Sequence, residues 1–387
     1  MIEHTCGNSL NLVEPDGLEL ASWLVKQNTI TPSPNESTVL KQIASLLEQS
    51  GFTCELNFYD KDMSGRANLC ARLHPNFHGP ALCLGGHIDT VPLGTDVWDH
   101  DPFMGEVIDG RLFGRGSCDM KAGVGAILSV AVKMAPFVRD RDFVIHLYGG
   151  EERSCEGSFA MVQQEKFLKN IAAAIIAEPT CCKPLLGHRG CIWLKLSTKG
   201  KTAHACMPAK GDNALVKLLK SVEGILDFKF NLSHPVLGES TFVISTLHSG
   251  LNTNSVPDSA VMTIDMRVVP GQSFESIVRK IQSIIGSQVK IEVLQNLVPL
   301  WTEPDNDFVK MIYECYSSIS DSRIFPGAVQ FATDGAALRS KNAQMPIVIW
   351  GPGDTSLAHQ LNESCSCKDI ALMEKMYEKV VRSFYGI

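Results

Sequence analysis

The feature that most constrains the fold is an alternation of short apolar runs with segments of helical periodicity, interrupted once in mid-chain. Apolar runs bounded by turn residues predict strands, and apolar residues three and four positions apart predict helices. We expect strands at 53–59, 68–73, 81–85, 143–148, 172–176 and 346–350, and helices within 17–51 (broken at 31–34) and at 120–134, 158–167, 306–319 and 369–384. Such alternation is typical of an α/β layer structure with a largely parallel sheet.

Residues 190–294 interrupt this pattern with a different order: strand, helix, strand, strand, helix, strand. That order is the ferredoxin-like split unit. A chain of 387 residues is long enough for two or three domains. The simplest prediction is one α/β domain formed by residues 1–184 and 297–387, interrupted by a smaller inserted α+β domain at 185–296.

Composition excludes several classes of protein. Apolar residues make up 44% of the chain and charged residues 20%, which is ordinary globular usage rather than that of a disordered chain. The 42 Asp and Glu outnumber the 35 Lys and Arg, so the formal net charge is −7. Without an excess of basic residues, nucleic acid is not an expected partner.

The sequence also predicts no membrane partner, because its apolar runs fall far short of the ~20 residues that a spanning helix needs. The first residues, 1–8, have neither a basic region nor an apolar one, so we expect no secretory signal and a cytoplasmic location. Thirteen cysteines, an odd number without any CxxC pair, predict free and mostly buried thiols.

Carboxylate and imidazole groups recur beside the predicted strands, where ligand crevices form in open α/β sheets. The groups are His87 and Asp89 after strand 81–85, Asp119 directly before helix 120–134, Glu151 and Glu152 after strand 143–148, Glu178 after strand 172–176, and His359 beyond strand 346–350. Each has an alternative structural explanation taken alone, such as a helix cap, a turn residue or a core histidine. Together they favour a site for cations, since neighbouring carboxylates on buried strands need a cation or a proton.

The order and spacing of these groups resemble the aminoacylase family of dinuclear zinc hydrolases, which includes acetylornithine deacetylase, succinyl-diaminopimelate desuccinylase and the glutamate carboxypeptidases. The resemblance covers nearly the whole chain and rests on His87-Ile88-Asp89, the segment 114–123, Glu151-Glu152 and Glu178-Pro179. The step of 181 residues from Glu178 to His359 lies where the family has its inserted domain. The resemblance therefore implies a zinc-peptidase-like catalytic domain and an inserted lid that also makes a homodimer.

The resemblance also implies a role for each group. Asp119 would bridge two metal ions, His87 and Glu178 would ligate one, Glu152 and His359 would ligate the other, Glu151 would be the general acid and base, and Asp89 would be the partner of His87. The implied cofactor is two Zn²⁺, for which Co²⁺ can substitute. The peptide between Asp119 and Met120 is a candidate for the cis bond that the family often has there.

Further residues match the family segments that hold a small N-acylated amino acid. His204 matches a histidine that stabilises the oxyanion, commonly from the partner subunit, and its alternative is an exposed loop histidine. Arg267 matches an arginine that binds the substrate carboxylate, and its alternative is a surface arginine. Asn252 and Asn254 match a loop that precedes this arginine. Thr333 and Gly353 lie in two short sequence motifs that differ between family members with different substrates.

These two strings disagree about the substrate. Residues 351–353 with 358–360 read GPG and AHQ and are similar to acetylornithine deacetylases, whereas Thr333-Asp334-Gly335 is similar to the succinyl-diaminopimelate branch. The first string flanks a predicted metal ligand, so we expect an acetylornithine deacetylase of arginine biosynthesis. The alternatives are a succinyl-diaminopimelate desuccinylase, a dipeptidase or carboxypeptidase of the same family and, from another class, a catalytically silent binding homologue.

Overall fold

The computed structural model describes residues 15–60 and 65–387, which form two compact units. The first unit holds the described residues up to 187 together with 301–329 and 333–387, and the second holds 188–300 and 330–332. Residues 1–8, on which the expectation about a secretory signal rests, lie outside the described residues.

A six-stranded sheet forms the centre of the first unit, in the order β1-β2-β6-β3-β7-β16. Its strands are β1 (Thr53–Phe58), β2 (Ala67–Arg72), β3 (Ala81–His87), β6 (Phe143–Tyr148), β7 (Ile171–Ile176) and β16 (Ile347–Ile349). The neighbours from β6 to β16 pair in parallel, whereas β1 with β2 and β2 with β6 pair antiparallel. The predicted α/β fold is therefore confirmed, with a mixed sheet whose antiparallel edge the sequence did not indicate.

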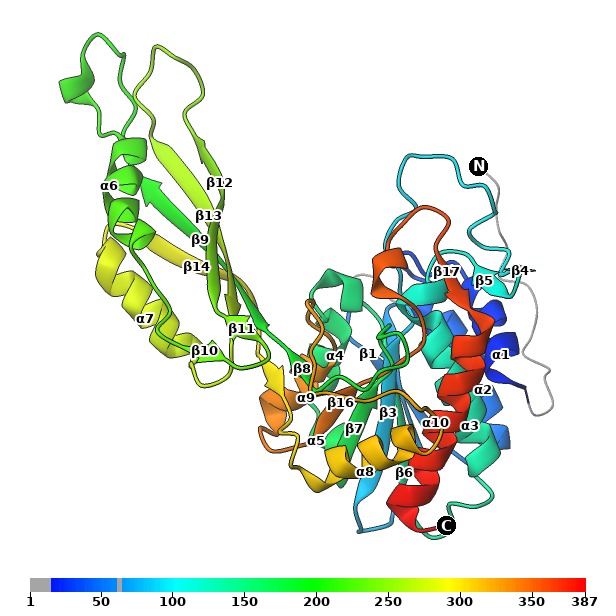
Figure 1. Cartoon of the computed structure of the whole chain (residues 1–387). Helices are drawn as coiled ribbons and strands as arrows, with labels where there is room; N and C mark the ends of the chain where they lie inside the picture. The colour runs from blue at the N-terminus through cyan, green and yellow to red at the C-terminus, as the bar shows by residue number, and fades with distance from the viewer. Residues whose placement is uncertain (1–14, 61–64) are drawn as a thin grey trace. The chain divides into compact units, whose positions relative to one another are not determined.

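Helices cover both faces of this sheet (Figure 1). They are α1 (Gly17–Val25), α2 (Glu36–Gln49), α3 (Ala122–Met134), α4 (Glu156–Met161), α5 (Glu165–Leu168), α8 (Asp307–Ser317), α9 (Gly335–Lys341) and α10 (Cys367–Tyr385). Helices α1, α2 and α10 pack around α3, while α4 packs against β2 and α9. Strands β3 and β6 are buried along their whole length, which explains their continuous apolar runs.

Helix α3 approaches the sheet closely because glycine stands at its second position. A Cβ atom on Gly123 would lie 2.2 Å from the carbonyl oxygen of Ala177, the residue that follows β7 and precedes Glu178. This contact brings the start of α3, and Asp119 before it, against the end of β7.

A small three-stranded sheet, in the order β17-β5-β4, was not predicted from the sequence. Its strands are β4 (Val107–Ile108), β5 (Arg111–Phe113) and β17 (Ser364–Ser366). Strands of two or three residues leave no periodic pattern in a sequence. Pairing of β17 with β5 fixes the chain between His359 and α10 beside the segment that leads to Asp119.

The second unit is a four-stranded antiparallel sheet in the order β12-β13-β9-β14, with α6 and α7 against one face (Figure 1). Its elements are β9 (Gly190–Lys199), α6 (Ala214–Leu226), β12 (Thr241–Ser249), β13 (Ser259–Val268), α7 (Phe274–Ile285) and β14 (Lys290–Leu297), with a hairpin of β10 (Ser233–His234) and β11 (Gly238–Glu239). Two short strands, β8 (Gly187–His188) and β15 (Leu300–Trp301), pair with each other. The ferredoxin-like prediction is confirmed.

Two further expectations concern membranes and thiols. Among the described residues, no helix has the length and apolar character that crossing a bilayer requires. All twelve cysteines in the described part of the chain are free, and eight of them are buried.

We predict that Gly123→Ala lowers both thermal stability and metal affinity, because the added methyl group would force α3 away from the main chain next to Glu178. Gly224→Ala in α6, in the other unit, is the matched control. Its added Cβ would lie 2.7 Å from the Cγ2 methyl of Ile284, so we expect it to lower thermal stability but to leave metal affinity unchanged. Calorimetry and zinc titration test both variants. Equal metal affinity in Gly123→Ala and the parent protein would contradict the prediction.

Candidate metal centre

The predicted site residues of the first unit follow neighbouring parallel strands. His87 ends β3, Glu151 and Glu152 follow β6, Glu178 follows β7, and His359 comes after β16. Because β6, β3, β7 and β16 are parallel neighbours, their carboxyl ends meet at one edge of the sheet. The fold therefore brings together residues that are up to 272 positions apart in the sequence.

Asp119 lies between two imidazole rings. Its Oδ1 is 3.1 Å from Nε2 of His87, and its Oδ2 is 3.3 Å from Nε2 of His359. Burial alone would raise the pKa of Asp119, but the hydrogen bonds from both histidines outweigh it and hold the pKa below its ordinary value. The peptide from Asp119 to Met120 is cis, as the family resemblance implied. The two rings thus aim the same type of nitrogen at opposite oxygens of one carboxylate.

Glu178 completes a first cluster with His87 and Asp119, whose potential ligand atoms all lie within 4.8 Å of one another. The Oε1 atom of Glu178 is buried, lies 3.9 Å from Nε2 of His87, and has no hydrogen-bond partner among the residues that the structure describes. Burial, and then the charge of Asp119, raise the pKa of Glu178 well above its ordinary value. A buried carboxylate oxygen without a donor is unfavourable unless a cation or a proton compensates it.

Glu152 and His359 form a second cluster with Asp119, again within 4.8 Å. Nε2 of His359 is 3.0 Å from Oε1 of Glu152, and hydrogen bonds to Asp119 and Glu152 raise the pKa of His359 to about 10. The imidazolium thus supplies positive charge at a place where a metal ion could supply it instead.

The donors of both clusters fit two divalent cations. Two imidazoles and three carboxylates converge, one carboxylate is shared, and Oε1 of Glu178 has no partner within the described part of the chain. Nitrogen and oxygen ligands without thiolate suit zinc. Cys118 precedes the shared carboxylate, but its Sγ donates to the carbonyl of Asp354, 3.1 Å away, and burial raises its pKa well above the ordinary value. It is a packed thiol, as the sequence suggested for most cysteines.

The turn that carries Glu151 and Glu152 is fixed by Asp89. The two carboxylate oxygens of Asp89 accept the main-chain N–H groups of Glu151 at 3.1 Å and of Glu152 at 3.2 Å. The nearest Asp89 oxygen to Nδ1 of His87 is the carbonyl at 3.0 Å, whereas the carboxylate is 3.6 Å away. Asp89 therefore orients His87 mainly through its main chain and uses its side chain to hold the Glu151-Glu152 turn.

Two glycines make this turn possible. Gly150 adopts φ of 67°, which favours glycine, and a Cβ there would meet Nη2 of Arg66 at 2.4 Å. A Cβ on Gly149 would meet Oε2 of Glu36 at 2.3 Å. Burial raises the pKa of Glu36 to about 7. Sequence reasoning missed Glu36 and Arg66, since neither residue stands in a distinctive motif.

Glu151 lies beside both clusters and belongs to neither. It is partly exposed, yet desolvation by the surrounding protein raises its pKa well above the ordinary value. The thiol of Cys155 donates to Oε1 of Glu151 over 3.6 Å. A carboxyl group that keeps its proton more readily than usual is suited to general acid and base chemistry.

The second unit contains His204 on an exposed loop, next to the loop of Asn254. Val256 N–H donates to the carbonyl of Ala203, and Ala205 N–H donates to that of Asn254. Nδ1 of His204 accepts the N–H of Cys206 at 3.1 Å, so the ring proton lies on Nε2. His204 is exposed and carries its ring proton on Nε2, so this N–H group can act as a donor, as oxyanion stabilisation requires.

Arg267 and the asparagines of this unit differ in their availability. Arg267, on β13, donates from Nε and Nη2 to Asp265 at 2.8 and 3.0 Å. That ion pair occupies one edge of the guanidinium group, so a substrate carboxylate would have to use the other edge or displace Asp265. Asn252 and Asn254 are exposed.

Thr333 and Gly353, of the first unit, are both buried. The Thr333 hydroxyl accepts the N–H of Gly335 at 3.2 Å at the start of α9. Gly353 has φ of 91°, and a Cβ there would lie 2.8 Å from Sγ of Cys118. Both residues support main-chain turns, and Gly353 packs directly on the segment of Asp119.

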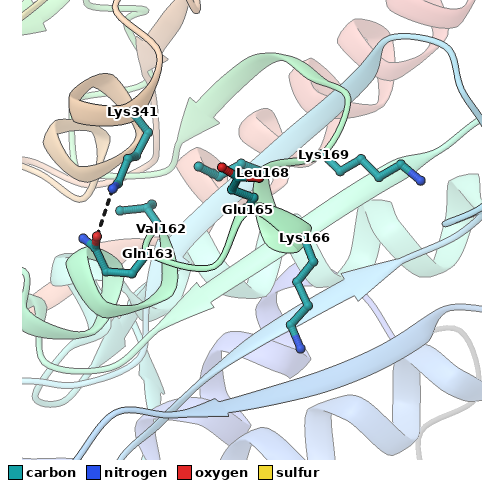
Figure 2. Close-up of a pocket in the computed structure, with 7 residues that line it drawn as sticks. All are labelled: Val162, Gln163, Glu165, Lys166, Leu168, Lys169 and Lys341. Atoms are coloured by element: carbon teal, nitrogen blue, oxygen red, sulfur yellow. Dashed lines mark hydrogen bonds between the residues drawn. The ribbon is translucent and has the colours of Figure 1, made fainter.

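A separate pocket of about 600 Å³ lies on the first unit (Figure 2). It is lined by Val162, Gln163, Glu165, Lys166, Leu168, Lys169 and Lys341 and contains none of the predicted site residues. Nζ of Lys341 donates to Gln163 over 2.9 Å, and Lys166 pairs with Glu55. Nothing in this lining indicates chemistry.

Comparison with known proteins agrees with the geometry at the strand ends. Residues 83–383 match the model of peptidase family M20/M25/M40. The chain belongs to this family. As an M20 hydrolase, it is similar to succinyl-diaminopimelate desuccinylase from Wolbachia pipientis, with 29% identity covering 96% of this chain and 94% of the relative. It is also similar to a probable succinyl-diaminopimelate desuccinylase from Staphylococcus aureus, with 27% identity covering 95% and 98%.

Solved structures of other proteins share the fold. A metallo-carboxypeptidase from Sulfolobus solfataricus gives a TM-score of 0.74 at 17% identity and covers 96% of this chain and 100% of its own. A tripeptidase from Staphylococcus aureus gives 0.73 at 19% identity and covers 97% and 100%. The relatives back the desuccinylase alternative better than the acetylornithine deacetylase expected from the sequence, which has no specific support among them.

We predict that the metal-free protein takes up two zinc ions per chain and that His359→Ala takes up one with the parent affinity. His359 contributes to only one of the two clusters, whereas Asp119 contributes to both. His78→Ala, at an exposed histidine outside the clusters, is the control. Elemental analysis after dialysis measures the stoichiometry, and two tightly held ions in His359→Ala would contradict the assignment.

Proposed function

We propose that this M20 hydrolase removes the acyl group from a small N-acylated amino acid, and that N-succinyl-diaminopimelate is the preferred substrate. The observation that carries the reaction type is the carboxylate of Glu151 beside two clusters that share Asp119. The choice of substrate is supported by the desuccinylases that match 95–96% of the chain. The reaction would release succinate and belong to amino-acid biosynthesis.

The structure weakens the argument for acetylornithine. Acetylornithine is expected from the string Gly351 to Gln360, which includes Gly353 and His359. Gly353 packs on Cys118, and His359 contacts Asp119. The residues of this string therefore support the segment that carries Asp119. Deacetylases and desuccinylases would share that segment, so the string says little about which acyl group is removed. Acetylornithine remains the second substrate to test.

The chemistry assigned to the chain begins with proton transfer. When bound, two divalent cations would supply Lewis acidity and ease the deprotonation of water. Oε1 of Glu151 accepts the Cys155 thiol, so we assign Oε2 as the atom that takes a proton from the attacking water. The same carboxyl group then gives that proton to the leaving amine. The carboxylate of Asp89 accepts the main-chain N–H of Glu151 and so holds Glu151 in place.

The second unit would complete this site from a partner subunit. The Nε2–H of His204 would donate to the oxyanion of the amide in the transition state. Strand β12 is an edge strand, and its Val243 and Leu247 are 55% and 43% exposed. An exposed apolar edge is an unfavourable surface for a monomer. We therefore infer that two chains associate through the inserted domain.

Release of primary amine from N-succinyl-diaminopimelate, measured on zinc-reconstituted protein beside Nα-acetyl-L-ornithine and a dipeptide panel, tests the proposed substrate. We expect a kcat/KM at least 100-fold higher for the succinyl compound. Faster release from acetylornithine would restore the first expectation. Turnover of dipeptides alone would make the protein a peptidase, and inactivity on every amide would favour the silent binding homologue.

For Glu151→Gln we predict a fall in kcat of about 10² to 10⁴, because the amide cannot accept the proton of the attacking water. Zinc content should remain at the parent level, since Glu151 belongs to neither ligand cluster. Glu165→Gln, at an exposed carboxylate, is the matched control and should keep full activity. Parent-level turnover in Glu151→Gln would refute the assigned proton transfer.

The partner role of His204 predicts complementation between two inactive variants. His204→Ala and Glu151→Gln should each be nearly inactive, and a mixture reassembled from both should regain about a quarter of the parent activity. Half of the randomly formed dimers would then be mixed and contain one intact site. Sedimentation should show a dimer. An active monomer, or a mixture without recovered activity, would contradict the role.

A further inference from the structure

One buried carboxylate, Glu363, accepts four hydrogen bonds from the segment that precedes and includes Asp119. Its Oε1 accepts the N–H groups of Cys118 at 2.8 Å and Asp119 at 3.0 Å. Its Oε2 accepts the N–H of Gly116 at 3.1 Å and Nη1 of Arg115 at 2.7 Å. Glu363 is 1% exposed, so water does not compete for these bonds.

Arg115 extends this arrangement to the other segments of the site. Its Nη1 also donates to the carbonyl of Gln360, next to His359, at 3.3 Å. Its Nη2 donates to the carbonyl of Pro92, on the chain that follows Asp89, at 3.2 Å. The guanidinium group lies over the ring of Trp98. One ion pair therefore ties together the three segments that provide His87, Asp119 and His359.

The local backbone shows why such a tie is needed. His359 and Asn362 both have positive φ, 64° and 56°, which side-chain-bearing residues rarely adopt. Gly114 and Gly116 also have positive φ. Neither the segment of Gly114 and Gly116 nor the segment of His359 and Asn362 lies in a long helix or strand. The conformation of each therefore depends on hydrogen bonds such as those that Glu363 accepts.

We propose that Glu363 is a positioning residue: it fixes the segments of Asp119 and His359 relative to each other and so sets the affinity and geometry of the metal centre. The inference rests on the proposed function only in requiring that the clusters bind metal. Glu363 is a member of neither ligand cluster. Glu363→Gln would place an amide NH₂ group against main-chain N–H groups and would remove the charge that pairs with Arg115.

The test is a competition for Zn²⁺ between the protein and a chromophoric chelator, together with the visible spectrum of the Co²⁺-loaded protein. We expect Glu363→Gln to bind zinc about 10- to 100-fold more weakly, as is usual when a group that orients a ligand is lost. We also expect an altered cobalt spectrum. Glu374→Gln is the matched control, because Glu374 likewise accepts a main-chain N–H, a hydroxyl and an ammonium group, from Gly17, Ser129 and Lys133, but outside the site.

Parent-level zinc affinity and an unchanged cobalt spectrum in Glu363→Gln would overturn the proposal, as would an equal loss of affinity in Glu374→Gln. Should Glu363→Gln fail to fold, Arg115→Lys is the second test of the proposal. This variant keeps the Glu363 carboxylate that accepts the main-chain N–H groups, but it loses the guanidinium group that donates to Gln360 and Pro92. A smaller fall in zinc affinity is expected there, and no fall would refute the proposal. A parent protein that binds no zinc would instead refute the metal centre itself.

Discussion

The carboxylate of Asp119, placed between the imidazoles of His87 and His359, is the interaction on which the rest of the site depends. His87 ends β3, His359 lies beyond β16, and Asp119 precedes α3, which packs against β3 and β6. Hydrogen bonds with Asp119 and Glu152 raise the pKa of His359, and hydrogen bonds with the two histidines hold the pKa of Asp119 below its ordinary value. The parallel sheet, the close packing of α3 and the bonds of Glu363 all serve to keep this carboxylate in place.

Much of this could be predicted from the sequence, because the signals are local. Buried parallel strands read as apolar runs, and polar residues directly after such runs belong to the strand ends, as for Glu178 after β7. The inserted unit was equally clear, since β13 alternates strictly between buried and half-buried residues. The antiparallel pairing of β1 and β2 could not be predicted, because the direction of a strand leaves no mark on its composition.

The missing parts are those that depend on long-range partners. Glu363 lies in a segment without periodicity, and nothing in the sequence shows that its acceptors face Gly116, Cys118 and Asp119. The carboxylate of Asp89, which lies 3.6 Å from Nδ1 of His87, also binds the turn of Glu151, and no local pattern predicts that second contact. For the same reason, the string from Gly351 to Gln360 is a weak guide to the substrate, since Gly353 packs on Cys118 and His359 contacts Asp119.

The central claim is that Asp119 bridges two divalent cations, and anomalous diffraction from zinc-loaded crystals tests it most directly. The account predicts two anomalous peaks about 3.5–4 Å apart, with Asp119 between them, Glu178 and His87 on one side, and Glu152 and His359 on the other. A single peak, or two peaks that do not share Asp119, would contradict it.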